Sequence, residues 1–219
     1  MSNVFVNDES LAAVAKVIRS KNGTDNTYKP SEMAGAAAKL PSYDFVKNII
    51  EKSSTATEIV IPDYVTAIGR GAFSYSQYLK SIAIPDSVTS ISRSVFSGCT
   101  SLASIAIPDS VTSISIYVFY NCTSLTSIEI PNSVTGITKY TFDGCTSLEF
   151  VKLGQGFNSN NLDLSASTKY TRETIVSCLK ALKDRTGEAT YIFTIGPGNL
   201  KKLIAEDIKI ATDKNWTVA

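Results

Sequence analysis

Residues 79–124 decide the fold, because the second half of this stretch repeats the first. Leu79 to Ser101 read LKSIAIPDSVTSISRSVFSGCTS and Leu102 to Ser124 read LASIAIPDSVTSISIYVFYNCTS, identical at 18 of 23 positions. The pattern extends from Ile59 to Leu153. Its columns are Pro62, Pro85, Pro108 and Pro131; Phe73, Phe96, Phe119 and Phe142; Leu79, Leu102, Leu125 and Leu148; and Cys99, Cys122 and Cys145, with Ser76 in the first copy. A fixed period in the twenties, with Leu and Ile at fixed offsets, is typical of a solenoid.

Each copy is predicted to form one coil that begins with a short strand. Ile82 and Ile84 alternate with small residues, which favours a strand with one buried face. Pro85 then removes a ladder donor and ends the strand. Phe96 and Cys99 return along another side of the coil. One coil cannot bury its own apolar side, so the coils must stack, with parallel strands about 4.7–4.9 Å apart.

These copies resemble BspA-like leucine-rich repeats, through the sequences IPDSVTSI and CTSL and the aromatic residue between them. The resemblance covers residues 59–153 and implies a parallel-stranded solenoid used for adhesion or binding. It names no ligand. The fold class that we expect is therefore α/β: a leucine-rich repeat solenoid of about 23-residue repeats, with other modules at its two ends.

The segments before the repeats are predicted to be helical. Residues 1–41 read as a helical hairpin whose helices end at Gly23 and Pro41. This hairpin has few large apolar residues, so it should dock on something or assemble, and it is a candidate oligomerisation segment. Residues 42–58 are predicted to form a helical lid over the first coil, because the end of a stack exposes a cut hydrophobic core.

After Leu153 the period stops, and residues 154–219 are predicted to form an α/β cap. Leu162 and Leu164 alternate as one more strand of the repeat sheet would. The later signals are a helix from Thr171 to Gly187, a strand over residues 191–195, and a helical segment through Leu200, Leu203, Ile208 and Ala211.

Both end segments resemble modules of phage and prophage tail-associated proteins of Gram-positive bacteria. At the N-terminus the resemblance lies in residues 11–40, LAAVAKVIRSKNGTDNTYKPSEMAGAAAKL, where KPSEM is the most specific part. At the C-terminus it lies in TIGPGNL (194–200) and IATDKNWTV (210–218). The resemblance implies a place on a virion tail, while the repeats imply a bacterial or extracellular surface. The first residues carry neither a basic nor an apolar signal region, so synthesis in the cytoplasm without a signal peptide is expected.

Composition excludes several classes of function. The 219-residue chain has 21 Lys and Arg against 20 Asp and Glu, whereas a nucleic-acid partner would favour a strong basic excess. No apolar run approaches the roughly 18–20 residues of a membrane span. The chain contains no histidine, which removes Ser-His-Asp and Cys-His nucleophile activation and His-ligated zinc. We therefore expect no enzyme activity, catalytic residue, cofactor or metal site.

One enzymatic alternative stays open, a carboxylate-dependent enzyme that acts on glycans. Its candidate carboxylates are Asp63, Asp86 and Asp109. All three follow the repeat proline, where turn chemistry accounts for them. A second alternative is a purely structural spacer.

The cysteines do not form a disulfide pattern. Cys99, Cys122 and Cys145 occupy one column and should lie side by side as buried, reduced thiols that behave as small hydrophobes. Cys178 lies outside the repeats, so it is the one thiol expected to react quickly with a reagent.

Candidate binding residues come from comparing the copies with one another. The second and third copies differ at Lys80/Ala103, Arg93/Ile116, Ser94/Tyr117, Ser97/Tyr120 and Gly98/Asn121, and four of these five differences surround the phenylalanine. The region gathers tyrosines, which give stiff amphipathic contact area in binding surfaces. The predicted ridge consists of Tyr75, Tyr78, Tyr117, Tyr120 and Tyr140. The alternative is that these rings only cover the edge of the core.

A second candidate surface is the concave sheet, whose outward strand positions are small except at one end. There, Glu129, Phe150 and Lys152 are the candidate residues. From both surfaces we expect a non-enzymatic binding or adhesion protein that recognises a protein or a cell-surface glycan.

Overall fold

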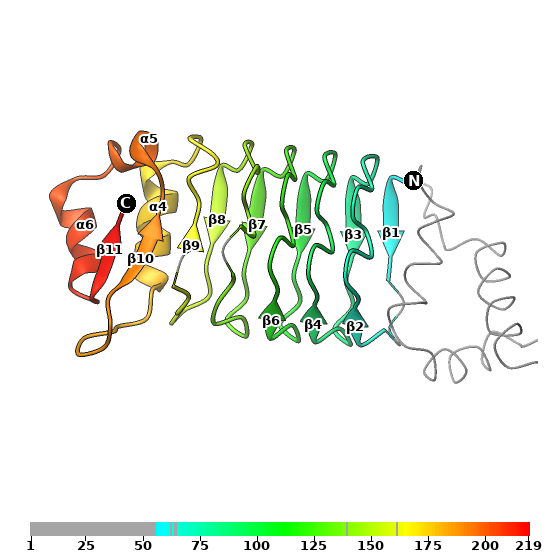
Figure 1. Ribbon diagram of the computed structural model, residues 1–219, viewed down its shortest axis with the longest axis horizontal. Helices are drawn as coiled ribbons and strands as arrows, with labels where there is room; N and C mark the ends of the chain where they lie inside the picture. Colours follow the sequence, from blue (N-terminus) through cyan, green and yellow to red (C-terminus); the bar gives the residue numbers. More distant parts are fainter. Residues whose placement is uncertain (1–55, 62, 64, 139, 161) are drawn as a thin grey trace, which may run out of the picture.

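The computed structural model describes residues 56–61, 63, 65–138, 140–160 and 162–219. Within them the chain forms a stack of coils followed by an α/β unit (Figure 1). The strands of the stack are β1 (Glu58–Val60), β2 (Ala67–Ile68), β3 (Ser81–Ala83), β4 (Ser90–Ile91), β5 (Ser104–Ala106), β6 (Ser113–Ile114), β7 (Ser127–Glu129) and β8 (Phe150–Lys152). No helix among the described residues is long and apolar enough to cross a membrane.

The coils stack in a register of one repeat. Strands β1, β3, β5, β7 and β8 lie side by side and parallel, with Ile59 opposite Ile82 and Ile128 opposite Val151 (Figure 1). Strands β2, β4 and β6 form a second parallel column in the same register. The predicted parallel-stranded repeat fold is therefore confirmed. We call the outward side of β1, β3, β5, β7 and β8 the strand face.

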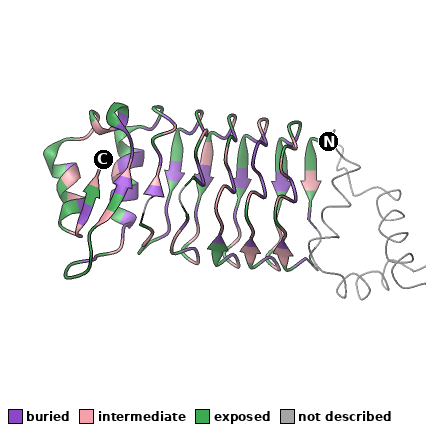
Figure 2. Ribbon diagram, viewed as in Figure 1, coloured by how far each residue is buried: buried purple, intermediate pink, exposed green. Residues whose placement is uncertain are grey.

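The predicted phenylalanine ladder is the centre of the core. Phe73, Phe96, Phe119 and Phe142 stack almost parallel, with successive ring centroids 5.5, 5.7 and 5.8 Å apart. None is more than 1% exposed. Figure 2 shows that buried residues recur in every coil along the length of the stack.

Each repeat cysteine donates its thiol to a carbonyl of the preceding coil. The bonds are Cys99 to Phe73 (3.0 Å), Cys122 to Phe96 (3.1 Å) and Cys145 to Phe119 (3.0 Å). Cys178, which was expected to be the reactive thiol, behaves in the same way. Its side chain is fully buried and donates to the Val151 carbonyl at 3.4 Å. That expectation was wrong because the segment after the repeats packs directly onto the last coil.

That segment forms a separate small sheet with helices. Its elements are β9 (Leu162–Asp163), α4 (Arg172–Ala181), β10 (Tyr191–Thr194), α5 (Pro197–Leu200), α6 (Ala205–Thr212) and β11 (Trp216–Val218). The sheet is parallel in the order β11-β10-β9. The helical segment predicted after the strand at 191–195 is thus two helices, α5 and α6.

The prediction that Leu162 and Leu164 extend the repeat sheet was wrong, because β9 pairs with β10. Helix α4 instead lies against β8 at the end of the stack. Its Thr174 hydroxyl donates to the Glu149 carbonyl at 3.4 Å, next to the bond from Cys178. Helix α4 therefore covers the last coil with an apolar face, including Ile175 and Leu179.

Charged side chains fasten the α/β unit together. Arg172 on α4 donates two hydrogen bonds to Asp207 on α6, at 2.7 and 2.8 Å. These bonds hold the pKa of the Asp207 carboxyl below its ordinary value. Lys214 donates to the Leu182 carbonyl just past the end of α4, at 2.9 Å. These contacts join α4 to the segment that follows it in the chain.

The predicted N-terminal hairpin (1–41) lies outside the described residues, as does the predicted lid except for residues 56–58. Glu58, the last residue assigned to that lid, is the first residue of β1 and pairs with Ser81.

Truncating the phenylalanine ladder should strongly destabilise the protein. We expect Phe119→Ala to lower the free energy of unfolding by roughly 3–5 kcal/mol, because it removes a fully buried ring between two stacked neighbours. A denaturant titration measures this loss. Phe150→Ala is the control, since Phe150 is 41% exposed and should lose much less. Equal losses would contradict the ladder's role.

All four thiols should resist labelling in the native protein. Burial raises the pKa of Cys99 and of Cys178 to about 12, so almost no thiolate is present at neutral pH. A thiol reagent followed by mass spectrometry should add no label until denaturant is present. Rapid labelling of one thiol in the folded protein would show that its column opens locally.

Candidate functional site

The strand face carries two rows of side chains. Successive residues of a strand point to opposite sides, so the first and third residues of each three-residue strand point outward. One row is Glu58, Ser81, Ser104, Ser127 and Phe150, and the other is Val60, Ala83, Ala106, Glu129 and Lys152. Strands β3 and β5 therefore present only small residues on this face, while its larger side chains lie on β1, β7 and β8.

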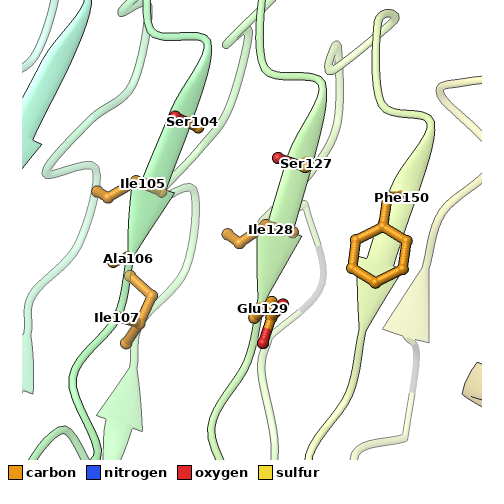
Figure 3. A pocket seen from close by; sticks show the side chains of 8 residues that line it. All are labelled: Ser104, Ile105, Ala106, Ile107, Ser127, Ile128, Glu129 and Phe150. Atoms are coloured by element: carbon orange, nitrogen blue, oxygen red, sulfur yellow. The ribbon is translucent and has the colours of Figure 1, made fainter.

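A hollow of about 370 Å³ lies on this face, over β5, β7 and β8 (Figure 3). Its lining residues are Ser104, Ile105, Ala106, Ile107, Ser127, Ile128, Glu129 and Phe150. Figure 3 shows the ring of Phe150 on β8 at one side, with Ser127 on the neighbouring strand. The hollow is open, and Ser104, Ser127 and Glu129 contribute polar groups to a lining that is otherwise apolar.

The structure brings together the three residues predicted for this end of the sheet. Glu129 on β7 and Lys152 on β8 form an ion pair of 2.9 Å, and Phe150 is part of the same strand as Lys152. Both charged side chains are more than 60% exposed. The pair adds about 0–1 kcal/mol to stability, and it leaves this end of the strand face without net charge.

The predicted tyrosines lie near two backbone columns that flank the phenylalanine ladder, and both columns are left-handed. Two residues before each Phe are Gly71, Ser94, Tyr117 and Tyr140, with φ of 63°, 58°, 61° and 66°. Two residues after each Phe are Tyr75, Gly98, Asn121 and Gly144, with φ of 61°, 74°, 56° and 78°. L-amino acids rarely adopt this conformation, whereas glycine adopts it freely.

The column after the phenylalanine alternates between a large residue and glycine, for a steric reason. The ring of Tyr75 lies over Gly98 of the next coil, where an added Cβ would be 2.7 Å from a ring carbon. Asn121 lies in the same way over Gly144, where a Cβ would be 2.0 Å from the amide oxygen. Although Tyr75 is 71% exposed, one part of its ring packs against Gly98.

The column before the phenylalanine holds a contacting group of rings. Tyr117 and Tyr140 stack at 5.3 Å with an interplanar angle of 10°, and Tyr120 meets Tyr117 edge-on at 5.6 Å. The guanidinium of Arg93 lies over the ring of Tyr117, with its central carbon 5.3 Å from the ring centroid. We call Tyr117, Tyr120 and Tyr140 the tyrosine cluster.

The five tyrosines of the predicted ridge thus fall into two groups. Tyr117, Tyr120 and Tyr140 touch one another, whereas Tyr75 and Tyr78 lie two coils before Tyr117, in the coil that carries Phe73. Tyr78 is 60% exposed. Whether either group contacts a ligand stays a prediction.

The cluster contributes little to the fold. A left-handed non-glycine residue costs roughly 1–2 kcal/mol, and both Tyr117 and Tyr140 have this conformation. The stacked pair of Tyr117 with Tyr140 and the edge-on pair of Tyr117 with Tyr120 each return about 0.5–1.5 kcal/mol, so the gains and the costs nearly offset one another. A comparison of the copies in the sequence could have shown that the fold does not require tyrosine in this column, because Gly71 occupies it in the first copy.

The described residues contain no group of three or more acidic or cysteine side chains placed to hold a metal ion. Asp63, Asp86 and Asp109 are exposed in successive turns, as their position after the repeat proline predicted.

A model of the BspA type leucine rich repeat region matches residues 45–170, in six copies. This chain belongs to the BspA-type leucine-rich repeat family. The match extends beyond residues 59–153 on both sides. No curated protein matches the chain.

Solved structures of other leucine-rich repeat proteins resemble this BspA-type chain. The T. pallidum leucine-rich repeat protein is 23% identical over 74% of this chain and 72% of its own, with a TM-score of 0.53, and shares the fold. A leucine-rich cell surface protein from Faecalibacterium prausnitzii is 39% identical over 44% of this chain, with a TM-score of 0.43. This chain covers only 26% of that protein's length.

The alternation of Tyr75 and Gly98 gives a direct test of packing between coils. We expect Gly98→Ala to destabilise the protein more than Gly156→Ala, because both glycines are left-handed but only Gly98 faces a neighbour. Gly156→Ala should lose roughly 1 kcal/mol of unfolding free energy, and Gly98→Ala a further 1–3 kcal/mol or so from overpacking. Thermal melts compare the two.

A second substitution identifies the cause of that difference. Tyr75→Ser removes the ring that the new methyl group meets, so the Tyr75→Ser, Gly98→Ala double variant should lose only about as much as Gly156→Ala. If the double variant is as unstable as Gly98→Ala alone, the ring contact is not the cause.

Proposed function

We propose that this protein is a non-enzymatic binding protein that attaches to a cell surface by recognising a protein or a glycan. The observation that carries the proposal is the tyrosine cluster, a group of partly exposed rings held at a backbone cost on a closely stacked scaffold. Backbone strain that gives the fold little in return clusters at functional sites. Stiff aromatic side chains on a fixed scaffold are what binding surfaces use.

A non-catalytic role is supported by how the polar side chains are spread. Asp63, Asp86 and Asp109 occupy successive coils at one turn, so they follow the stack rather than converge on one point. The carboxylate of Glu129 is paired with Lys152. A glycan-active enzyme would need two carboxylates facing one bond.

The setting that we propose is a virion tail or a bacterial surface. The support for a tail is the resemblance of residues 11–40 and of the C-terminal pieces to tail-associated modules. The support for a surface is the family of the repeats. Tail genes beside the gene for this protein would favour the first setting.

Cell binding tests the proposed function. The full chain, labelled on lysine, should bind intact bacterial or host cells saturably, with a dissociation constant in the roughly micromolar range of weak surface contacts. Protease-treated cells and periodate-treated cells then separate a protein receptor from a glycan. The heat-denatured chain is the control for non-specific adsorption.

Two outcomes would contradict the proposal. If no cell type binds the chain saturably, the repeats do not act in attachment. If a chain truncated before residue 56 loses all binding while its repeats stay folded by circular dichroism, attachment belongs to the N-terminal segment and the repeats are a spacer.

A further inference from the structure

Arg93 presents a guanidinium that is oriented but unpaired. It is exposed and lies over the ring of Tyr117, with its central carbon 5.3 Å from the ring centroid. Stacking on a ring uses the flat face of a guanidinium and leaves its in-plane N–H groups free. No acidic side chain of the described residues forms an ion pair with Arg93 or with Arg70, its equivalent one coil earlier.

The charge of this edge differs from that of the whole chain. The described residues of the four equivalent segments, 69–78, 92–101, 115–124 and 138–147, include the basic residues Arg70 and Arg93 and the single acid Asp143. The whole chain is nearly balanced, with 21 basic and 20 acidic residues. On the strand face, in contrast, Lys152 is neutralised by Glu129. The edge with the tyrosine cluster therefore favours an anionic ligand.

The arrangement of the rings indicates what carries the anionic group. Tyr117 and Tyr140 occupy the same position in consecutive coils, so their hydroxyl groups repeat along the stack. A protein partner usually anchors a large apolar side chain in a pocket, but the hollow described above lies on the strand face. A polymer of polar rings with regularly spaced anionic groups needs no such pocket.

We propose that Arg93, with Tyr117, Tyr120 and Tyr140, binds the carboxylate or phosphate groups of an acidic cell-surface polysaccharide. Arg93 forms a bidentate contact with one anionic group, because a planar fork of donors matches both carboxylate and phosphate. The phenol groups hydrogen-bond neighbouring sugar hydroxyls. This inference rests on the proposed attachment function and assigns it a site and a ligand chemistry.

The chain supplies its own matched substitutions. Tyr117→Ser and Tyr140→Ser introduce the residue that occupies this column at Ser94, and Arg93→Ile introduces the residue that occupies its column at Ile116. The backbone at Ser94 is left-handed as well, so the fold should accept these changes. Thermal melts within a few degrees of the wild type confirm it.

The binding test uses immobilised polymers and the full chain. Polygalacturonate supplies carboxylates, glycerol-phosphate teichoic acid supplies phosphates, dextran is the neutral control, and polyglutamate is an acidic peptide. Wild-type protein should bind one of the two anionic polysaccharides and not dextran, and added salt should weaken the binding. Arg93→Ile and the Tyr117→Ser, Tyr140→Ser double variant should each lose at least tenfold in affinity.

Three further variants test whether the guanidinium matters beyond its charge, and whether binding belongs to the tyrosine cluster or to the other candidate residues. Arg93→Lys keeps the charge but loses the planar fork, so it should bind more weakly than wild type. Tyr75→Ser and a Glu129→Ala, Phe150→Ala, Lys152→Ala triple variant should bind as wild type does, because neither change touches the cluster.

Each contrary outcome has a distinct meaning. Loss of binding only in the strand-face triple variant overturns the assigned site while the attachment function stands. Binding to polyglutamate with no binding to either polysaccharide would make the ligand an acidic peptide and overturn the glycan assignment. Saturable cell binding without binding to any polymer also overturns it. A wild-type chain that binds neither cells nor polymers refutes both proposals.

Discussion

The fold depends on each coil pairing with the next in a register of 23 residues. Backbone bonds maintain that register on every side of the coil: Phe73 donates to the Val95 carbonyl at 2.9 Å, Phe96 to Val118 at 2.9 Å, and Thr112 to Thr89 at 3.0 Å. In such a stack each residue meets its own equivalent one coil away. A column is therefore stable only if its residue type packs against a copy of itself, and a phenylalanine or an isoleucine does this well.

The same constraint explains where the columns change. A large side chain at a left-handed position leans over the next coil, so its successor must be small, and the alternation of Tyr75, Gly98, Asn121 and Gly144 follows. The column that contains Tyr117 and Tyr140 solves the problem differently, because two rings in succession can stack. That solution requires two tyrosines in a strained backbone. The fold does not need it, since the same column accepts Gly71 and Ser94.

The repeats could be predicted from the sequence because equivalent residues of successive coils pack on one another. The same residue types must therefore recur at a constant spacing along the chain. The buried phenylalanines, the parallel strands and their one-repeat register all follow from the spacing of Phe96 and Phe119 and of Ile82 and Ile105. The segment after Leu153 carries no period, so its partners had to be guessed from local patterns. Leu162 and Leu164 alternate as a strand should, but alternation says nothing of which strand lies beside them. Cys178 was misjudged for the same reason, because a helix that covers a stack buries residues that belong to no column.

The candidate site was only partly visible in the sequence. Differences between near-identical copies pointed to Tyr117 and Tyr120, because a change between two copies is easily seen. The position of Arg93 also differs between these copies, but Arg93 was not among the predicted binding residues. They could not show that Arg93 lies on the ring of Tyr117, nor that Tyr75 packs on a glycine instead. Those facts depend on the left-handed backbone, which sends side chains toward the neighbouring coil. A stacked scaffold holds such side chains at fixed spacing, so recognition there requires little ordering on binding. Variation at a few edge positions can then change the ligand while the self-packing core stays the same.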